Sequence, residues 1–115
     1  MYLLVNVLEQ KQHLSGILEG FARIGIQGST VFDSTGMGRV LMKTSATLPV
    51  MEHINKVLKD LESSNKTMLT VVREKSVLDK AVDVIRSFCG DLNEPGKGIV
   101  FAFPLEFVEG LPETD

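Results

Sequence analysis

The distribution of apolar and polar positions along the chain predicts four strands and two main helices. Short apolar runs without helical spacing are found at residues 2–8, 29–33, 67–72 and 98–103. Runs of this length and composition are typical of strands. Two longer segments, Leu14 to Ile24 and Leu78 to Cys89, instead carry apolar residues at the i, i+3, i+4, i+7 spacing of a helix. Each is followed by a glycine, Gly25 or Gly90, which is a common helix stop.

This order of elements predicts an α+β fold, the ferredoxin-like βαββαβ sandwich. In it, a four-stranded antiparallel sheet carries two helices on one face. The topology places the first and third strands at the centre, and residues 2–8 and 67–72 are both strongly apolar runs. The other sheet face would stay open, and packing of three copies, sheet against sheet, would cover it.

Two local features predict how closely the first helix packs and where the second helix begins. Gly16 and Gly20 lie in the first helix and are expected to let it approach the sheet closely. The segment Ser76-Val77-Leu78-Asp79 resembles a capping box, so the second helix is expected to begin at this serine.

A long connector joins the second and third strands. Residues 34–66 exceed the roughly 12–15 residues above which loops are usually functional or disordered. Pro49 suits the first turn of a helix, and an amphipathic stripe follows, so an extra helix is predicted here. The stripe consists of Met51, Ile54, Val57, Leu58 and Leu61. Two interpretations remain open: the helix packs on its own subunit or a neighbour, or it is a movable element offered to a partner.

Composition and charge predict a single globular domain and argue against some classes of function. The chain has 115 residues, of which 43% are hydrophobic and 23% charged, so residues 1–115 are expected to form one domain with a loose acidic tail at 112–115. The net charge of −3 disfavours nucleic-acid binding through bulk charge. The opening residues lack the features of a signal peptide and are too few to span a bilayer. With a single cysteine, this predicts a cytoplasmic protein without direct membrane insertion.

The residues give no positive case for catalysis or for a metal site. His13 and His53 lack neighbours at metal-ligand spacing, and Cys89 lies on the core stripe of the second helix. Carboxylates such as Asp79 and Asp83 are interpreted as helix surface. No catalytic and no metal-binding residue is predicted, and the protein is not expected to be an enzyme.

Two glycine clusters remain as candidates for a ligand-binding site. Gly36-Met37-Gly38-Arg39 follows one strand, and Pro95-Gly96-Lys97-Gly98 precedes another. Glycine lets backbone amides approach an anion closely, and Arg39 or Lys97 would add positive charge. The alternative is that both clusters are ordinary turns beside strands.

The first cluster belongs to a longer pattern. Gly25-Ile26-Gln27-Gly28-Ser29-Thr30-Val31, followed by Gly36-Met37-Gly38-Arg39, resembles the signature of the PII nitrogen-regulatory family in composition and spacing. Gly96-Lys97-Gly98-Ile99-Val100-Phe101 resembles the start of that family's last strand. The likeness covers about residues 1–103, and the connector corresponds to the family's T-loop.

The resemblance implies a regulatory role in nitrogen metabolism. PII proteins are homotrimers that sense metabolites, bind adenine nucleotides in clefts between subunits, and engage a transporter or an enzyme through the T-loop. In the family, the glycine backbones cradle phosphates and the arginine pairs with them. By position, the ligand-binding residues would be Gly28, Ser29, Thr30, Gly36, Gly38, Arg39, Gly96, Lys97 and Gly98.

Departures from the family pattern point to a divergent member. Ile99 stands where PII proteins have a phosphate-binding lysine, Gly110-Leu111-Pro112 replaces a segment with two phosphate-binding arginines, and Val40 replaces the glutamine used with magnesium and 2-oxoglutarate. The uridylylated T-loop tyrosine is absent too, since Tyr2 is the only tyrosine. Charge-assisted contacts contribute about 1.5–3 kcal/mol each, so losing three weakens a triphosphate ligand by orders of magnitude. A monophosphate, a cyclic nucleotide or another small anion is therefore expected as the effector, whose identity stays open.

Two other classes of function fit the same fold. One is a ligand-free protein-interaction module, in which the glycine clusters are only turns. The other is a metal-related trimer of the CutA type, which shares the fold.

Overall fold

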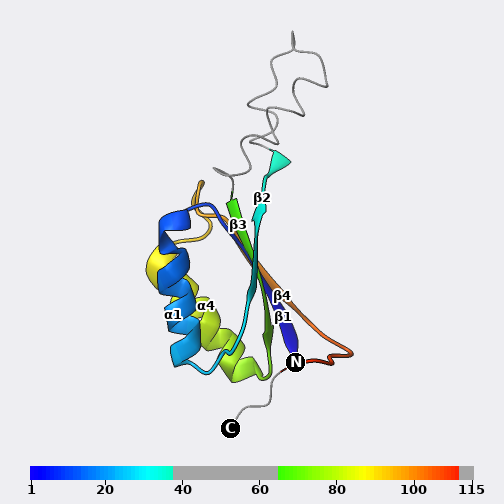
Figure 1. The fold of residues 1–115 in the computed structure, drawn as a ribbon. Coiled ribbons are helices and arrows are strands. Elements are labelled where there is room, and N and C mark those ends of the chain that lie inside the picture. The colour runs from blue at the N-terminus through cyan, green and yellow to red at the C-terminus, as the bar shows by residue number, and fades with distance from the viewer. Residues whose placement is uncertain (38–64, 112–115) are drawn as a thin grey trace, which may run out of the picture.

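The computed structural model describes residues 1–37 and 65–111 of the chain (Figure 1). The elements are β1 (Tyr2–Leu8), a short 3-10 helix η1 (Lys11–His13), α1 (Leu14–Arg23), β2 (Thr30–Ser34), β3 (Asn65–Val72), α4 (Lys75–Cys89) and β4 (Ile99–Pro104). This confirms the predicted order of strands and helices. The extra helix predicted between residues 49 and 61 and the predicted tail at 112–115 lie outside the described residues.

The four strands form one antiparallel sheet with the order β2-β3-β1-β4. The two central strands are β1 and β3, as the predicted topology requires. Helices α1 and α4 lie side by side on the same face of the sheet, which is the expected ferredoxin-like arrangement (Figure 1). The edges of the sheet are therefore β2 and β4, the two strands that the glycine clusters adjoin.

The core lies between the two helices and the sheet. Because successive strand residues point to opposite faces, the even-numbered residues of β1 face the helices. Leu4 and Leu8 are 1% and 0% exposed and pack with Met68 and Val72 of β3. The helices contribute the buried residues Ile17, Phe21, Leu78, Ala81, Ile85 and Cys89. Each fully buried large apolar side chain stabilises the fold by about 1.5–3 kcal/mol, so this layer accounts for the helix positions.

Both predicted glycine stops end their helices, but the predicted capping box is wrong. Gly25 has a φ of 93° and Gly90 a φ of 78°, a backbone conformation that favours glycine. Helix α4 begins at Lys75, and its N-cap is Glu74, whose backbone is extended. Ser76 therefore lies inside the first turn, where it cannot act as the cap.

Gly16 and Gly20 permit close packing of α1 against α4, and not against the sheet as the sequence suggested. A Cβ atom on Gly16 would lie 2.5 Å from Cε1 of Phe88. A Cβ atom on Gly20 would lie 2.5 Å from Cγ1 of Val84. Both neighbours belong to α4, so the two glycines set the distance between the helices.

These two contacts predict different outcomes for the same substitution. Gly20→Ala is expected to destabilise the protein by about 1 kcal/mol, because the stiff β-branched Val84 cannot rotate away and overpacking costs more than the helix propensity gained. Gly16→Ala is expected to be neutral or stabilising by up to about 1 kcal/mol, because Phe88 is 40% exposed and its ring can turn outward. Urea unfolding of the two variants measures the difference. Equal destabilisation by both would contradict this account.

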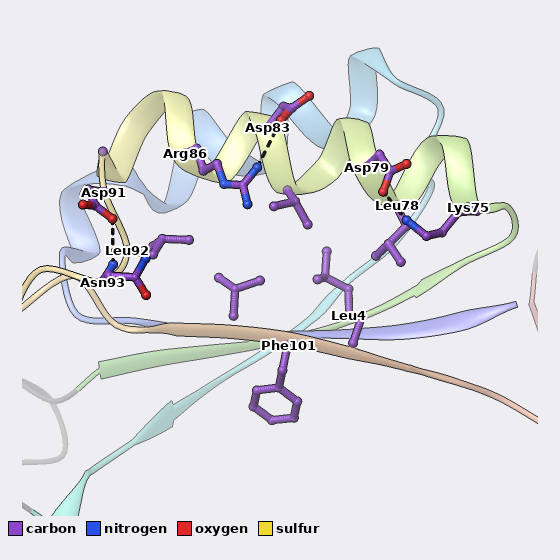
Figure 2. Close-up of a pocket in the computed structure, with 14 residues that line it drawn as sticks. Leu4, Lys75, Leu78, Asp79, Asp83, Arg86, Asp91, Leu92, Asn93 and Phe101 are labelled. Carbon is purple, nitrogen blue, oxygen red and sulfur yellow. Dashed lines mark hydrogen bonds and ion pairs between the residues drawn. The ribbon is translucent and has the colours of Figure 1, made fainter.

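The sheet face opposite the helices is apolar and open in the protomer. Its β4 residues Ile99, Phe101 and Phe103 are 56%, 46% and 45% exposed, and they pair with Val7, Val5 and Leu3 of β1. Figure 2 shows the ring of Phe101 pointing away from α4, on the far side of the sheet. Phe32 on β2, 45% exposed, extends the same face, because it pairs with Thr67, the β3 partner of Val7. An exposed apolar area of this kind marks an interaction surface.

None of the helices in the described ranges is long and apolar enough to cross a membrane.

Candidate functional site

The candidate ligand residues lie at the two edges of the sheet. Gly28 and Ser29 immediately precede β2, Thr30 is its first residue, and Gly36 follows its last residue, Ser34, by two positions. The segment 96–98 immediately precedes β4. Gly38 and Arg39 lie outside the described residues.

One protomer does not bring these residues together. Strands lie about 4.8 Å apart, so the three steps from β2 to β4 separate the two edges by roughly 14 Å. Along β2, the four steps from Thr30 to Ser34 cover roughly 13 Å. The register places Ser34 opposite Asn65, and Ile99 opposite Val7, so the end of β2 and the start of β4 share one end of the sheet (Figure 1). Gly28 and Ser29 belong to the other end.

Backbone conformation and packing within the protomer explain why glycine occurs at positions 96 and 98 of the second cluster. Gly98 has a φ of 94°, and a Cβ atom there would lie 2.0 Å from the carbonyl oxygen of Val7. No side chain fits at such a distance, so glycine is required for β4 to pair with β1. Gly96 also has a positive φ, of 80°, but a Cβ atom there would come no closer than 3.8 Å, to Oε2 of Glu9.

Gly28 and Gly36 differ from Gly98 in this respect. Neither has a positive φ, and a Cβ atom on either would meet no atom of residues 1–37 and 65–111 within 4 Å. Packing within the described part of the protomer therefore does not require glycine at these two positions. Their open surroundings leave room for a close approach of another molecule to the backbone.

Gly28 also lines a cavity of about 210 Å³ between the α1–β2 turn and the β3–α4 turn. Its walls include the apolar side chains of Val71, Val77 and Leu111, and Arg73 and Glu74 bring one charge of each sign. Ser29 contributes to the neighbouring structure, since its Oγ lies 2.6 Å from Oγ1 of the buried Thr70. No sequence motif points to Arg73, which reaches this cavity from the turn between β3 and α4.

A larger groove of about 650 Å³ runs between α4 and β4 (Figure 2). Its floor contains Leu4, Leu78 and Val100. The charged residues along it already have partners. Lys75 donates to Asp79 at 2.5 Å, Arg86 lies 3.6 Å from Asp83, and the Asp91 carboxylate accepts from the backbone N–H of Asn93 at 3.0 Å. The two helix carboxylates are surface groups, as predicted. Of the predicted ligand residues that the structure describes, none lines this groove.

Metal-binding residues do not cluster in the parts of the chain that the structure describes. Residues 1–37 and 65–111 contain no group of three His, Cys, Asp or Glu side chains placed to hold a metal ion. The ring of His13 packs against Phe88, with ring centroids 5.8 Å apart. His53 lies outside the described residues.

A comparison with known protein families identifies the family to which this fold and glycine pattern belong. The family model of nitrogen regulatory protein P-II matches residues 2–112, nearly the whole chain. The chain belongs to the PII family. No curated protein matches it significantly. PII family proteins are regulatory, non-enzymatic signal transducers, and they are typically trimers that interact with partner proteins. This chain is accordingly a nitrogen-regulatory signal-transduction protein.

The departures from the PII pattern can now be placed in the structure. Ile99, which stands at the position of a PII phosphate-binding lysine, is 56% exposed and belongs to the apolar sheet face. Lys97 lies close enough to Cys89, a core residue, for its charge to lower the pKa of that thiol.

Cys89 itself is a buried thiol, 2% exposed. Burial raises the pKa of this thiol, and the nearby Lys97 charge lowers it by a smaller amount. Both effects follow from the cost of an anion in an apolar site and the attraction of a cation. The thiol is thus inert at neutral pH.

This pKa shift predicts a loss of stability at alkaline pH. At neutral pH and below, the thiol is protonated in both states, because an ordinary cysteine has a pKa of about 8.5, so it adds no pH dependence there. At higher pH the unfolded chain ionises first, because the folded-state pKa is raised, and the free energy of unfolding falls. Wild-type protein should therefore lose more stability than Cys89→Ala between pH 8 and pH 10 in urea titrations. Parallel losses in the two proteins would show that this thiol makes no contribution.

Proposed function

We propose that this PII protein is a homotrimer that binds a small anionic metabolite or an adenine nucleotide in clefts between its subunits. Ligand occupancy would change the connector at 34–66 and so control a transporter or an enzyme. A cytoplasmic location belongs to the proposal, since the single Cys89 thiol suits a reducing compartment.

The main observation behind the proposal is that the candidate residues form two sets, which lie far apart within one protomer. The β2 edge holds Gly28, Ser29, Thr30 and Gly36, and Gly38 and Arg39 follow in the sequence, whereas the β4 edge holds Gly96, Lys97 and Gly98. Because roughly 14 Å separates the edges, one small ligand can contact both sets only where two protomers meet. The open surroundings of Gly28 and Gly36 fit such a shared cleft.

The apolar face of the sheet supports the trimer. Ile99, Phe101 and Phe103 are about half exposed in the protomer, and a neighbouring subunit would remove them from water. Each of these side chains contributes about 1.5–3 kcal/mol when fully buried. Three copies packed around a common axis would cover this face on every subunit.

The expected ligand carries few charges. Arg39 is the first residue proposed to pair with an anion and Lys97 the second. The lysine position of the family pattern holds Ile99, on the apolar face, and the segment at 110–112 holds no arginine. A monophosphate or a cyclic nucleotide therefore fits better than a triphosphate.

A thermal-shift screen with AMP, cyclic AMP, ADP and ATP tests the proposal. A ligand at 100 times its Kd stabilises the folded state by about 2.7 kcal/mol, which raises the Tm of a domain this size by roughly 10 °C. We expect AMP or cyclic AMP to shift the Tm more than ATP at equal concentration. Arg39→Ala should keep the ligand-free Tm and lose most of the shift. If no nucleotide shifts the wild-type Tm, the ligand-free interaction module is the better description, and micromolar affinity for ATP would contradict the weakened site.

A further inference from the structure

The carboxylate of Glu9 lies beside the second glycine cluster. Glu9 follows Leu8, the last residue of β1, and it is exposed in the protomer. A Cβ atom on Gly96 would lie 3.8 Å from Oε2 of Glu9, and a Cβ atom on Gly98 would lie 3.5 Å from the backbone nitrogen of Glu9. The backbone and the side chain of Glu9 therefore both adjoin the turn at 96–98.

The register of the sheet explains this contact. Val7 of β1 pairs with Ile99 of β4, so the residue two places after Val7 meets the segment that leads into β4. Gly98 allows an unusually close approach of the two segments, since a Cβ atom there would lie 2.0 Å from the carbonyl oxygen of Val7. The pairing of β1 with β4 thus holds Glu9 next to the turn.

Glu9 forms no ion pair within residues 1–37 and 65–111. The ion pairs between described residues join Lys66 with Asp33, Lys75 with Asp79 and Arg86 with Asp83. Lys97 brings one positive charge to the turn at 96–98, and Glu9 brings one negative charge beside it. The charges at the turn therefore nearly cancel, which suits an anion of low charge better than one of high charge.

The effect of this carboxylate on a bound anion depends on the charge of the anion. Two unit charges about 7 Å apart in a water-like medium interact with an energy that corresponds to roughly a threefold change in affinity. ATP has two more phosphate groups than AMP and so carries about two more negative charges. A carboxylate at the turn is therefore expected to weaken the binding of ATP roughly tenfold more than the binding of AMP.

We propose that Glu9 is a specificity-determining residue of this PII protein, whose carboxylate selects ligands with few negative charges over a triphosphate. The inference rests on the proposed function, because it concerns an anion held at the turn at 96–98. It adds a repulsive group to the cations that the chain lacks at Ile99 and at 110–112. Repulsion of the wrong ligand is a general source of specificity, alongside attraction of the right one.

Calorimetric titrations with AMP and with ATP test the role of Glu9. They compare wild-type protein with Glu9→Gln, which removes the charge and keeps the size of the side chain, and with Glu9→Asp, which keeps the charge. Glu19→Gln is the matched control, because it removes the same charge from an exposed position on α1. The buffer holds about 50 mM salt and no magnesium, so that neither screening nor a metal ion hides the charge of the phosphates. Both glutamates are exposed, so the ligand-free Tm should be the same in all four proteins.

The ratio of the ATP affinity to the AMP affinity should rise roughly tenfold in Glu9→Gln. It should stay within about twofold of the wild-type ratio in Glu9→Asp and Glu19→Gln. At 1 M salt, where the Debye length is about 3 Å, the rise in Glu9→Gln should shrink to about threefold or less. An unchanged ratio in Glu9→Gln, or an equal rise in Glu19→Gln, would overturn the role of Glu9 and leave nucleotide binding intact. If wild-type protein and all three variants bind neither nucleotide, the proposed function fails, and this inference fails with it.

Discussion

Gly98→Ala is expected to destabilise the protein by about 3 kcal/mol or more. A residue other than glycine at a φ of 94° carries backbone strain of roughly 1–3 kcal/mol. The added Cβ would also lie 2.0 Å from the carbonyl oxygen of Val7, so the start of β4 must move away from β1. Thermal unfolding should show a Tm lowered by roughly 10 °C or more, since about 1 kcal/mol corresponds to roughly 4 °C in a domain of this size.

Gly96→Ala is the matched control for this substitution. Gly96 has a similar φ, of 80°, but the nearest atom to an added Cβ is 3.8 Å away. Only the backbone strain remains, and a loss of about 1–2 kcal/mol is expected. If the two alanine variants had the same Tm, the close approach of Gly98 to β1 would not be the reason for this glycine.

Phe101→Asp is expected to dissociate the proposed trimer into monomers. Phe101 lies at the middle of the apolar sheet face, between Ile99 and Phe103 and opposite Val5. Phe101 is 46% exposed in the protomer, so the substitution removes about 1 kcal/mol of apolar burial per subunit on association. It also places an ionised carboxylate in an apolar contact, which costs more. Light scattering after size-exclusion chromatography should give the mass of one chain.

Phe107→Asp separates this effect from a general effect of added charge. Phe107 is 77% exposed but follows β4 and belongs to no strand of the sheet. Its substitution should leave the mass of the assembly unchanged. A trimer mass for Phe101→Asp, or dissociation by both variants, would contradict a trimer held by the sheet face.

The periodicity of apolar residues was sufficient to predict the fold. It did not give the exact start of β3 or the neighbour of Gly20. The run at residues 2–8 gave β1 with correct bounds, whereas β3 begins two residues earlier than the apolar run suggested. Asn65 and Lys66 are polar, and they join the strand because β2 and β1 pair with them. Gly20 shows the same limit: its spacing marked a close contact, but only the packing identifies Val84 as the neighbour.

The sequence predicted which residues belong to the candidate site, but it did not predict the contacts that each of them makes. The glycine pattern identified the PII family, and the family match confirms it. The pattern could not show that Gly98 serves the pairing of β4 with β1, because a positive φ and a nearby carbonyl oxygen leave no mark in the sequence. The opposite edges of the two glycine clusters did follow from the predicted topology, in which the first and third strands are central, and the observed strand order confirms this.

Native mass spectrometry of the wild-type chain, with AMP, cyclic AMP, ADP and ATP added in turn, tests the central claim most directly. A site shared between protomers should put nucleotide on the trimer alone, with up to three molecules bound to each assembly. Nucleotide bound to single chains, or trimers that take up none of the four, would contradict a ligand cleft built from two copies.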